Sequence, residues 1–164
     1  MLQELRGNIR VFCRVRPAFI AETKSSIDYI GNDGTLIIVD PLKTQNTRRI
    51  FQFNKVLGPN STQEEVYKEA ESLIRSVMDG YNVCIFAYGQ TGSGKTYTMC
   101  GPENGSTMNT GINYKALNDL FDISCSREDL KYEMHVQMVE IYNEQVRDLL
   151  SDEATTTKYP SRLH

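Results

Sequence analysis

The chain has 164 residues, which is enough for one domain with a real hydrophobic core. Its hydrophobic fraction of 40% and charged fraction of 24% are typical of a soluble globular protein. The net charge of −3 argues against nucleic-acid binding as the main function, and no apolar run approaches the roughly 20 residues of a membrane span. The four cysteines show no metal-binding spacing. Cys13 and Cys84 lie in apolar runs, so we expect them to be reduced core residues of a cytosolic protein.

The first predicted element is a strand over residues 7–17. Apolar residues alternate there with arginines, which places Arg10, Arg14 and Arg16 on one face and the apolar side chains on the other. Pro17 stops the strand, because proline cannot donate to a β-ladder. One face of this strand is therefore expected to be apolar and the other basic.

The next segments predict a small antiparallel patch beside a larger sheet. Residues 18–28 have no regular pattern and are expected to be irregular. A turn signal at residues 31–34 leads into a short apolar strand over 35–40. Residues 50–57 alternate again and predict one further strand.

Helical periodicity replaces this alternation over residues 62–79. Ser61 is followed by Glu64, the spacing of a capping box. Acidic residues occupy the first turn, where the helix dipole favours anions, and Gly80 is placed to cap the C-terminus. We expect an amphipathic helix that delivers the chain into the next strand.

The most specific motif is a match to the phosphate-binding pattern G-x-x-x-x-G-K-[ST], formed by Gly89, Gln90, Thr91, Gly92, Ser93, Gly94, Lys95 and Thr96. Its flanks have the required context. Residues 83–88 are a continuous apolar run, as expected of a strand buried on both faces, and a helix can open over 95–99. Strand, loop and helix together predict a nucleotide-binding site.

Several residues of this motif have a chemical role in holding phosphate. Gly92 and Gly94 allow the backbone to curl so that successive N–H groups face anionic oxygens. Lys95 supplies a positive charge for the β- and γ-phosphates, and Thr96 offers a hydroxyl to Mg²⁺. The helix that begins here points its positive dipole end at the same place.

After this helix the pattern predicts four more segments and a tail. Glycine and proline break the helix at residues 101–107, in a loop that should lie close to the nucleotide. Residues 113–123 predict a helix, and 132–138 a strand with one polar face. Residues 141–150 are expected to form an irregular or helical exit, followed by a disordered tail over 151–164.

Four segments together resemble the kinesin motor domain. They are residues 9–17 (IRVFCRVRP), 53–57 with 62–67, 85–99 (IFAYGQTGSGKTYTM) and 139–150 (VEIYNEQVRDLL). The loop sequence ending in Tyr-Thr-Met is much narrower than the bare phosphate-loop pattern. The similarity runs from about Gly7 to Leu150, and residues 2–8 resemble the neck-to-motor junction of the kinesin-14 class, whose C-terminal motors usually move toward microtubule minus ends.

The resemblance implies a P-loop NTPase fold of the α/β class, with three layers, a mostly parallel central sheet and a small antiparallel lobe. Residues 1–150 would be the N-terminal half of the motor domain, so the sheet would be incomplete on its C-terminal side. It also implies an ATPase that couples hydrolysis of Mg²⁺-bound ATP to microtubule-based movement. The implied location is the cytoplasm, on the microtubule cytoskeleton, as a homodimer through a coiled coil that this chain does not contain.

The resemblance also assigns residues to the nucleotide. Arg14, Arg16 and Pro17 would line the adenine pocket, and Tyr97 would stack on the base. The phosphate loop from Gly89 through Thr96 would hold the phosphates, with Thr96 on Mg²⁺. From composition alone, arginines at 14 and 16 would instead suggest an exposed strand face.

The sequence departs from the family after Leu150. Neither the switch I pattern N-x-x-S-S-R-S-H nor the switch II pattern D-L-A-G-S-E is present, and the Ser-Arg-Leu-His at 161–164 lacks the upstream Asn. We therefore expect the N-terminal half of a motor domain, truncated in the gene prediction, in the transcript or by design, and without turnover. In kinesins, strands from the second half flank the strand that enters the phosphate loop, so residues 83–88 would lack both neighbours.

Two other functions stay open at this stage. The chain could be a non-motor module that binds nucleotide or a partner without turnover. It could also be a small nucleoside or nucleotide kinase, but that activity needs a lid carrying arginines after the phosphate loop. Residues 101–150 offer only Arg127 and Arg147, which are not arranged as such a lid.

Overall fold

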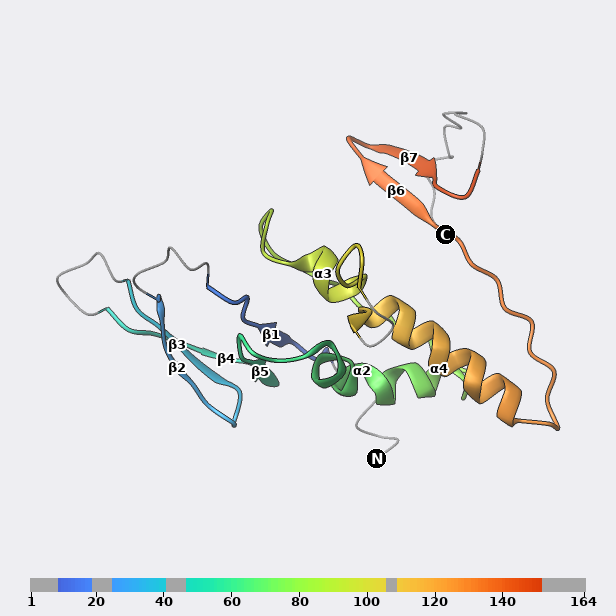
Figure 1. Ribbon diagram of the computed structural model, residues 1–164, viewed down its shortest axis with the longest axis horizontal. Helices are drawn as coiled ribbons and strands as arrows, with labels where there is room; N and C mark the ends of the chain where they lie inside the picture. The colour runs from blue at the N-terminus through green and yellow to red at the C-terminus, as the bar shows by residue number, and fades with distance from the viewer. Residues whose placement is uncertain (1–8, 19–24, 41–46, 106–108, 152–164) are drawn as a thin grey trace. The chain divides into compact units, whose positions relative to one another are not determined.

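The computed structural model describes residues 9–18, 25–40, 47–105 and 109–151. The chain divides into two compact units, Met1–Ser126 and Arg127–His164. Figure 1 labels the helices and strands of both. The predictions made for the neck-like segment and for all but the first residue of the polar tail lie outside the described residues.

Two small sheets form the N-terminal part of the first unit. β1 (Phe12–Arg14) pairs in parallel with β5 (Lys55–Leu57). β2 (Ile27–Ile30), β3 (Thr35–Ile38) and β4 (Arg49–Gln52) form an antiparallel sheet in that order, labelled in Figure 1. The predicted antiparallel patch is confirmed, and β2 is an element that the irregular pattern over residues 18–28 did not reveal.

The single strand predicted over residues 50–57 is wrong, because the chain changes sheets within it. The N–H of Phe53 donates to the carbonyl of Gly34, whereas the N–H of Asn54 donates to the carbonyl of Val11. The Asn54 side chain also accepts from the N–H of Val11 at 2.7 Å. Asn54 therefore transfers the chain from the antiparallel sheet to the edge of β1. The first strand is also shorter than predicted.

The core is formed by residues of α2 (Gln63–Val77), β5 and β3. Its buried apolar side chains are Leu36, Val56, Leu57, Val66, Tyr67, Ala70 and Ile74. The helix predicted over residues 62–79 is thus confirmed, with its last turn replaced by a short turn after Val77. Met78 is the C-terminal cap, and the predicted capping residue Gly80 lies two residues further on, with φ of 88°.

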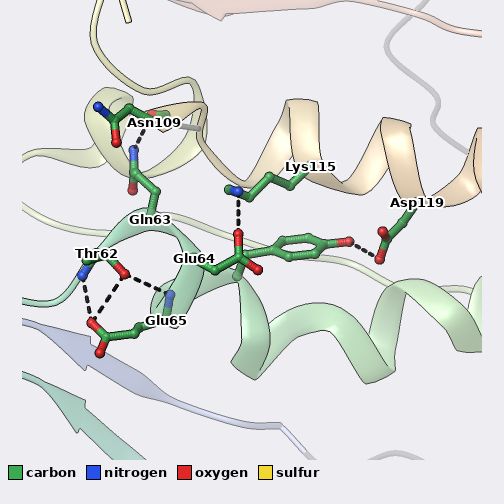
Figure 2. Close-up of polar contacts among 8 residues, drawn as sticks. Thr62, Gln63, Glu64, Glu65, Asn109, Lys115 and Asp119 are labelled. Carbon is green, nitrogen blue, oxygen red and sulfur yellow. Dashed lines mark hydrogen bonds and ion pairs between the residues drawn. The ribbon is translucent and has the colours of Figure 1, made fainter. Parts of the chain in front are cut away.

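The capping box of α2 begins one residue later than predicted. The Thr62 hydroxyl accepts from the N–H of Glu65, and the Glu65 carboxylate accepts from the N–H of Thr62 at 2.8 Å (Figure 2). Ser61 is unavailable for this role because its own N–H donates to the carbonyl of Gly58, in the turn that precedes the helix. Both pairs have the same spacing, so only the turn distinguishes them.

α4 (Ile112–Ser126) packs beside α2, and polar contacts join the two helices (Figure 2). The Tyr67 hydroxyl donates to Asp119 at 2.7 Å, and the Lys115 ammonium contacts the Glu64 carboxylate at 2.5 Å. The helix predicted over residues 113–123 is therefore confirmed. Neither of these helices, nor any other in the described part of the chain, is long and apolar enough to cross a membrane.

Residues 81–89 have no regular secondary structure and make no β-ladder with any other described segment. The strand predicted over 83–88 is thus not formed as a paired strand, in agreement with the expectation that its neighbours are missing. Phe86 is 86% exposed as a result. The prediction that Cys84 is a core residue is wrong for the same reason, since its thiol is exposed, and Cys13 is only half-buried.

The second unit contains a hairpin of β6 (Val139–Tyr142) and β7 (Gln145–Asp148). The strand predicted over residues 132–138 is wrong, and so is the irregular or helical exit over 141–150. Asn143 and Glu144 both have positive φ, 50° and 62°, as a two-residue hairpin turn requires. Glutamate rarely adopts this conformation, so the sequence carried only half of the usual turn signal.

Candidate nucleotide-binding site

The phosphate-loop motif forms a tight turn into α3 (Lys95–Met99). Gly92 and Gly94 have φ of 79° and 97°, in the left-handed region that favours glycine. A Cβ atom added at either position would meet nothing within 4 Å. The backbone conformation therefore requires these glycines, while the space beside them is open.

Lys95 is the first residue of α3, and its ammonium group bends back over the loop. It donates to the carbonyl oxygens of Gly89 and Gln90 at 2.8 and 2.9 Å. The Ser93 N–H donates to the same Gln90 carbonyl at 3.1 Å, which closes the turn. The ammonium is thus held by neutral acceptors, which a charged phosphate oxygen can replace with a stronger hydrogen bond.

The donors gathered here fit a phosphate group. The loop offers an ammonium, the N–H groups of a first helical turn and the exposed Thr96 side chain beside them. Among the residues the structure describes, no group of three or more His, Cys, Asp or Glu could hold a metal by itself. Mg²⁺ is commonly bound by substrate phosphates and a few protein oxygens.

Arg16 ties the end of β1 to the phosphate loop. Its guanidinium donates to the carbonyl of Gly92 at 3.2 Å, across 76 residues of sequence. Pro17 follows at an exposed position. The structure therefore brings Arg16, from the segment that carries the predicted arginines, into contact with the predicted phosphate loop.

Arg14 lies against Tyr97, with the guanidinium carbon 5.2 Å from the ring centroid. It donates to Gln63 Oε1 at 2.8 Å, to Thr98 Oγ1 at 3.0 Å and to the carbonyl of Ser61 at 3.3 Å. Burial lowers the pKa of Arg14 from its ordinary value, an effect that nearby Tyr97 partly opposes. Guanidinium and aromatic planes are both surfaces on which a base can stack.

Gln63 is a site residue that the sequence analysis missed. It is only 5% exposed, and its amide bonds both to Arg14 and to the backbone of α3, where it donates to the carbonyl of Tyr97 at 2.6 Å. Figure 2 shows its side chain directed toward Asn109, whose carbonyl lies 3.4 Å from Nε2. A signal existed: Gln63 is in helical register with buried Val66 and Ala70, so it is a polar residue within an apolar stripe.

The two ends of the loop after α3 meet close to Gln63, which contacts Asn109 in that loop. The N–H of Gly111 donates to the carbonyl of Cys100 at 3.1 Å. A Cβ at Gly111 would lie 2.4 Å from the backbone carbon of Met99, so glycine allows the two ends of the loop to touch. That this loop lies beside a bound nucleotide stays a prediction.

These features belong to a P-loop nucleotide-binding fold, and the comparison of structures agrees. The motor domain of the Kar3-like kinesin from Ashbya gossypii matches with a TM-score of 0.70 and 34% identity, over 89% of this chain and 47% of that one. A family described as microtubule binding matches residues 1–150. The chain belongs to the kinesin family, in its kinesin-14 branch, and corresponds to an N-terminal portion of the motor domain.

Curated relatives are similar over nearly all of this chain. Kinesin-like protein KIN-14A of Oryza sativa subsp. japonica is 68% identical over 98% of the chain, and kinesin-like protein KIN-14L of Arabidopsis thaliana is 62% identical over 94%. The chain spans only 17% and 16% of the length of these relatives. Membership of the kinesin family removes the small nucleotide kinase from consideration.

Proposed function

We propose that this chain supplies the nucleotide cradle of a kinesin-14 motor domain and binds ATP with Mg²⁺. The observation that carries the proposal is the loop from Gly89 to Thr96. Its left-handed glycines place Lys95 at the start of a helix, with an ammonium that donates to carbonyl oxygens of its own loop. This arrangement offers positive charge and free N–H donors, and it offers no competing carboxylate among the contacts described.

In this proposal the phosphates take the place of the loop carbonyls as acceptors for Lys95. The backbone of Gln90, Thr91, Gly92, Ser93 and Gly94 surrounds them, and the Thr96 hydroxyl is a ligand for Mg²⁺. The metal, when bound, neutralises phosphate charge. The chain's own contribution is to hold and orient the triphosphate.

In this proposal the base lies beside Arg14 and Tyr97, away from the phosphate loop. Tyr97 is about half exposed, so its ring offers a stacking surface, while Arg14 at the end of β1 and Arg16 just after it bring positive charge. Pro17 extends this edge. This assignment rests on the family resemblance and on the proximity of Arg14 to Tyr97 and of Arg16 to Gly92.

The complete protein is proposed to hydrolyse ATP and move along microtubules as a dimer, on the cytoplasmic microtubule cytoskeleton. For these 164 residues alone we expect nucleotide binding without turnover. Hydrolysis needs a group that positions the attacking water and a segment that senses the γ-phosphate. The sequence contains neither switch motif that provides these functions in kinesins.

A titration of fluorescent ATP tests the cradle. Lys95→Ala removes the charge aimed at the phosphates and is expected to weaken ATP binding by roughly tenfold or more. Lys68→Ala removes an exposed lysine from α2 and serves as the matched control, with unchanged affinity. Equal affinities for wild type and Lys95→Ala would remove the phosphate loop from the proposal.

Turnover distinguishes a nucleotide cradle from an active motor. We expect no microtubule-stimulated release of phosphate from the 164-residue chain in a steady-state assay with and without microtubules. Binding without turnover is also what a non-motor nucleotide-binding module would show, so the result bears on this chain alone. Stimulation by microtubules would show that the chain carries functional equivalents of the switches.

A further inference from the structure

Gln63 connects the two residues proposed to hold the base. Its Oε1 accepts from Arg14 at 2.8 Å and its Nε2 donates to the carbonyl of Tyr97 at 2.6 Å. We propose that Gln63 is a positioning residue that sets the base-binding pair, Arg14 and Tyr97, and through that pair contributes selectively to recognition of the base. This inference rests on the proposed nucleotide site and assigns a role within it.

On the Arg14 side, Gln63 limits the directions in which the guanidinium can point. The group has three acceptors, and Gln63 supplies the shortest contact. A half-buried guanidinium that loses an acceptor turns toward water, since a charged donor left unsatisfied is costly. Without Gln63, Arg14 is therefore expected to leave the face of the Tyr97 ring.

On the Tyr97 side, Gln63 fixes the backbone at the end of α3. The Tyr97 carbonyl already accepts from the N–H groups of Cys100 and Gly101, the latter at 2.9 Å, and Gln63 adds a side-chain donor from outside the helix. The helix has only five residues, so few intrahelical hydrogen bonds hold it. A contact from the buried start of α2 is therefore an important restraint on the orientation of the Tyr97 ring.

A planar amide suits this task because one end accepts and the other donates. Glutamate keeps the acceptor for Arg14 but brings a second oxygen toward the Tyr97 carbonyl, and methionine keeps the length but removes both functions. The described hydrogen bonds of Gln63 go to Arg14, Tyr97 and Asn109, none of which lies in the phosphate loop. Loss of Gln63 should thus leave phosphate binding intact.

The test compares MgATP with magnesium tripolyphosphate, which has the phosphates but no base. The chain carries a fluorophore at its N-terminus, and the soluble fraction of each preparation is used at a nanomolar concentration of the chain. The fluorescence change on titration with each ligand gives the dissociation constant. Gln63→Met is expected to weaken MgATP binding roughly tenfold and to change tripolyphosphate binding by less than about twofold. Gln137→Met, at an exposed position, is the matched control and should change neither constant.

The outcomes separate this inference from the proposed function. If the wild-type chain binds neither ligand, the proposed nucleotide site is wrong and the inference falls with it. If the wild type binds both but Gln63→Met weakens both equally, or neither, then Gln63 has a structural role at most and the positioning role alone is refuted.

A second variant covers the case in which Gln63→Met fails to fold. Gln63→Glu retains the contact to Arg14, so it should show the same selective loss for MgATP to a smaller extent. Helical circular dichroism of each variant establishes that α2 is present. An MgATP affinity equal to that of the wild type in a folded Gln63→Glu variant would show that the Tyr97 contact is irrelevant to the base.

Discussion

Helix α2 and residues 81–89 are neighbours in sequence and differ sharply in structure, because α2 is a regular helix and residues 81–89 have no regular secondary structure. α2 carries five acidic or basic residues in its first ten and still buries Val66, Ala70 and Ile74. Residues 83–88 are entirely apolar, yet Tyr88 is fully exposed. Apolar content alone therefore does not determine which segment is buried in this chain.

The difference follows from where each element finds its backbone partners. A helix satisfies its N–H and C=O groups internally and needs only one covered face. α2 packs against α4, with Tyr67–Asp119 and Lys115–Glu64 as polar links. A strand needs hydrogen-bonding neighbours, and none of the described segments provides them for residues 81–89.

The largest expected effect concerns this unpaired segment. We predict that the isolated chain is poorly folded or aggregates, because six uncharged apolar residues with high β-propensity are free to pair between molecules. Phe86→Lys, within the segment, should lower light scattering several-fold at equal concentration, since a charge interrupts such pairing. Scattering and urea unfolding followed by circular dichroism measure the two effects.

The control for this prediction is a second exposed phenylalanine. Phe121→Lys makes the same change on α4, where the side chain is 54% exposed but the backbone is helical. If both variants lowered scattering equally, exposed apolar area and not the unpaired strand would drive aggregation. A soluble monomer with one sharp unfolding transition would overturn the prediction altogether.

The elements that the sequence predicted well are those with a local cause. The apolar stripe of α2, the helix at α4 and the phosphate loop each follow from periodicity or spacing within about fifteen residues. The prediction placed the capping box one residue too early, because Ser61 and Thr62 each precede a glutamate by three residues. Only the bond from Ser61 to Gly58 decides between them.

The elements that it predicted poorly depend on distant partners. Residues 132–138 alternate like a strand but have no ladder among the described residues, while the hairpin β6–β7 forms through a turn with an atypical glutamate. In the site, the loop and Arg14 were predicted by motif and resemblance. Gln63 was not, because its partners lie 34 and 49 residues away.

An intermediate effect is expected where α2 meets α4. Tyr67→Phe removes the hydroxyl that donates to Asp119 and should destabilise the helix pair by about 1 kcal/mol. Tyr114→Phe, at a 53% exposed position on α4, is the matched control. Amide hydrogen exchange in α2, in the soluble fraction, measures the difference, and equal protection in the two variants would contradict a stabilising role for the Tyr67 contact.

The same tyrosine predicts a dependence on alkaline pH. Burial, and then the bond to Asp119, raise the pKa of Tyr67 above its ordinary value. Its contribution is therefore complete below about pH 10, the unfolded pKa of tyrosine, and is lost as pH rises toward the higher folded value. Protection of α2 should fall with rising pH in this range for the wild type and more weakly for Tyr67→Phe.

The smallest effect is expected in the turn between β2 and β3, which is ordered by contacts two residues apart. Asp33 accepts from the N–H of Thr35 at 3.0 Å and from its hydroxyl at 2.9 Å. The N–H contact first, and then the hydroxyl, hold the pKa of Asp33 below its ordinary value. The carboxylate is fully exposed, so solvent and salt screen most of this interaction.

Because the folded pKa is lowered, the stabilisation by Asp33 is present above about pH 3.9, the unfolded value, and is lost as pH falls through the folded pKa. Asp33→Asn keeps an acceptor for Thr35 but has no charge to lose, so exchange of the Thr35 amide, corrected for intrinsic rates, should become independent of this titration. Asp122→Asn on α4 is the control and should leave the acid dependence of Thr35 unchanged. If exchange of the Thr35 amide keeps the wild-type acid dependence in Asp33→Asn, another group orders this turn. The order of this turn would then not follow from contacts two residues apart, in contrast to the local cause that we infer for α2.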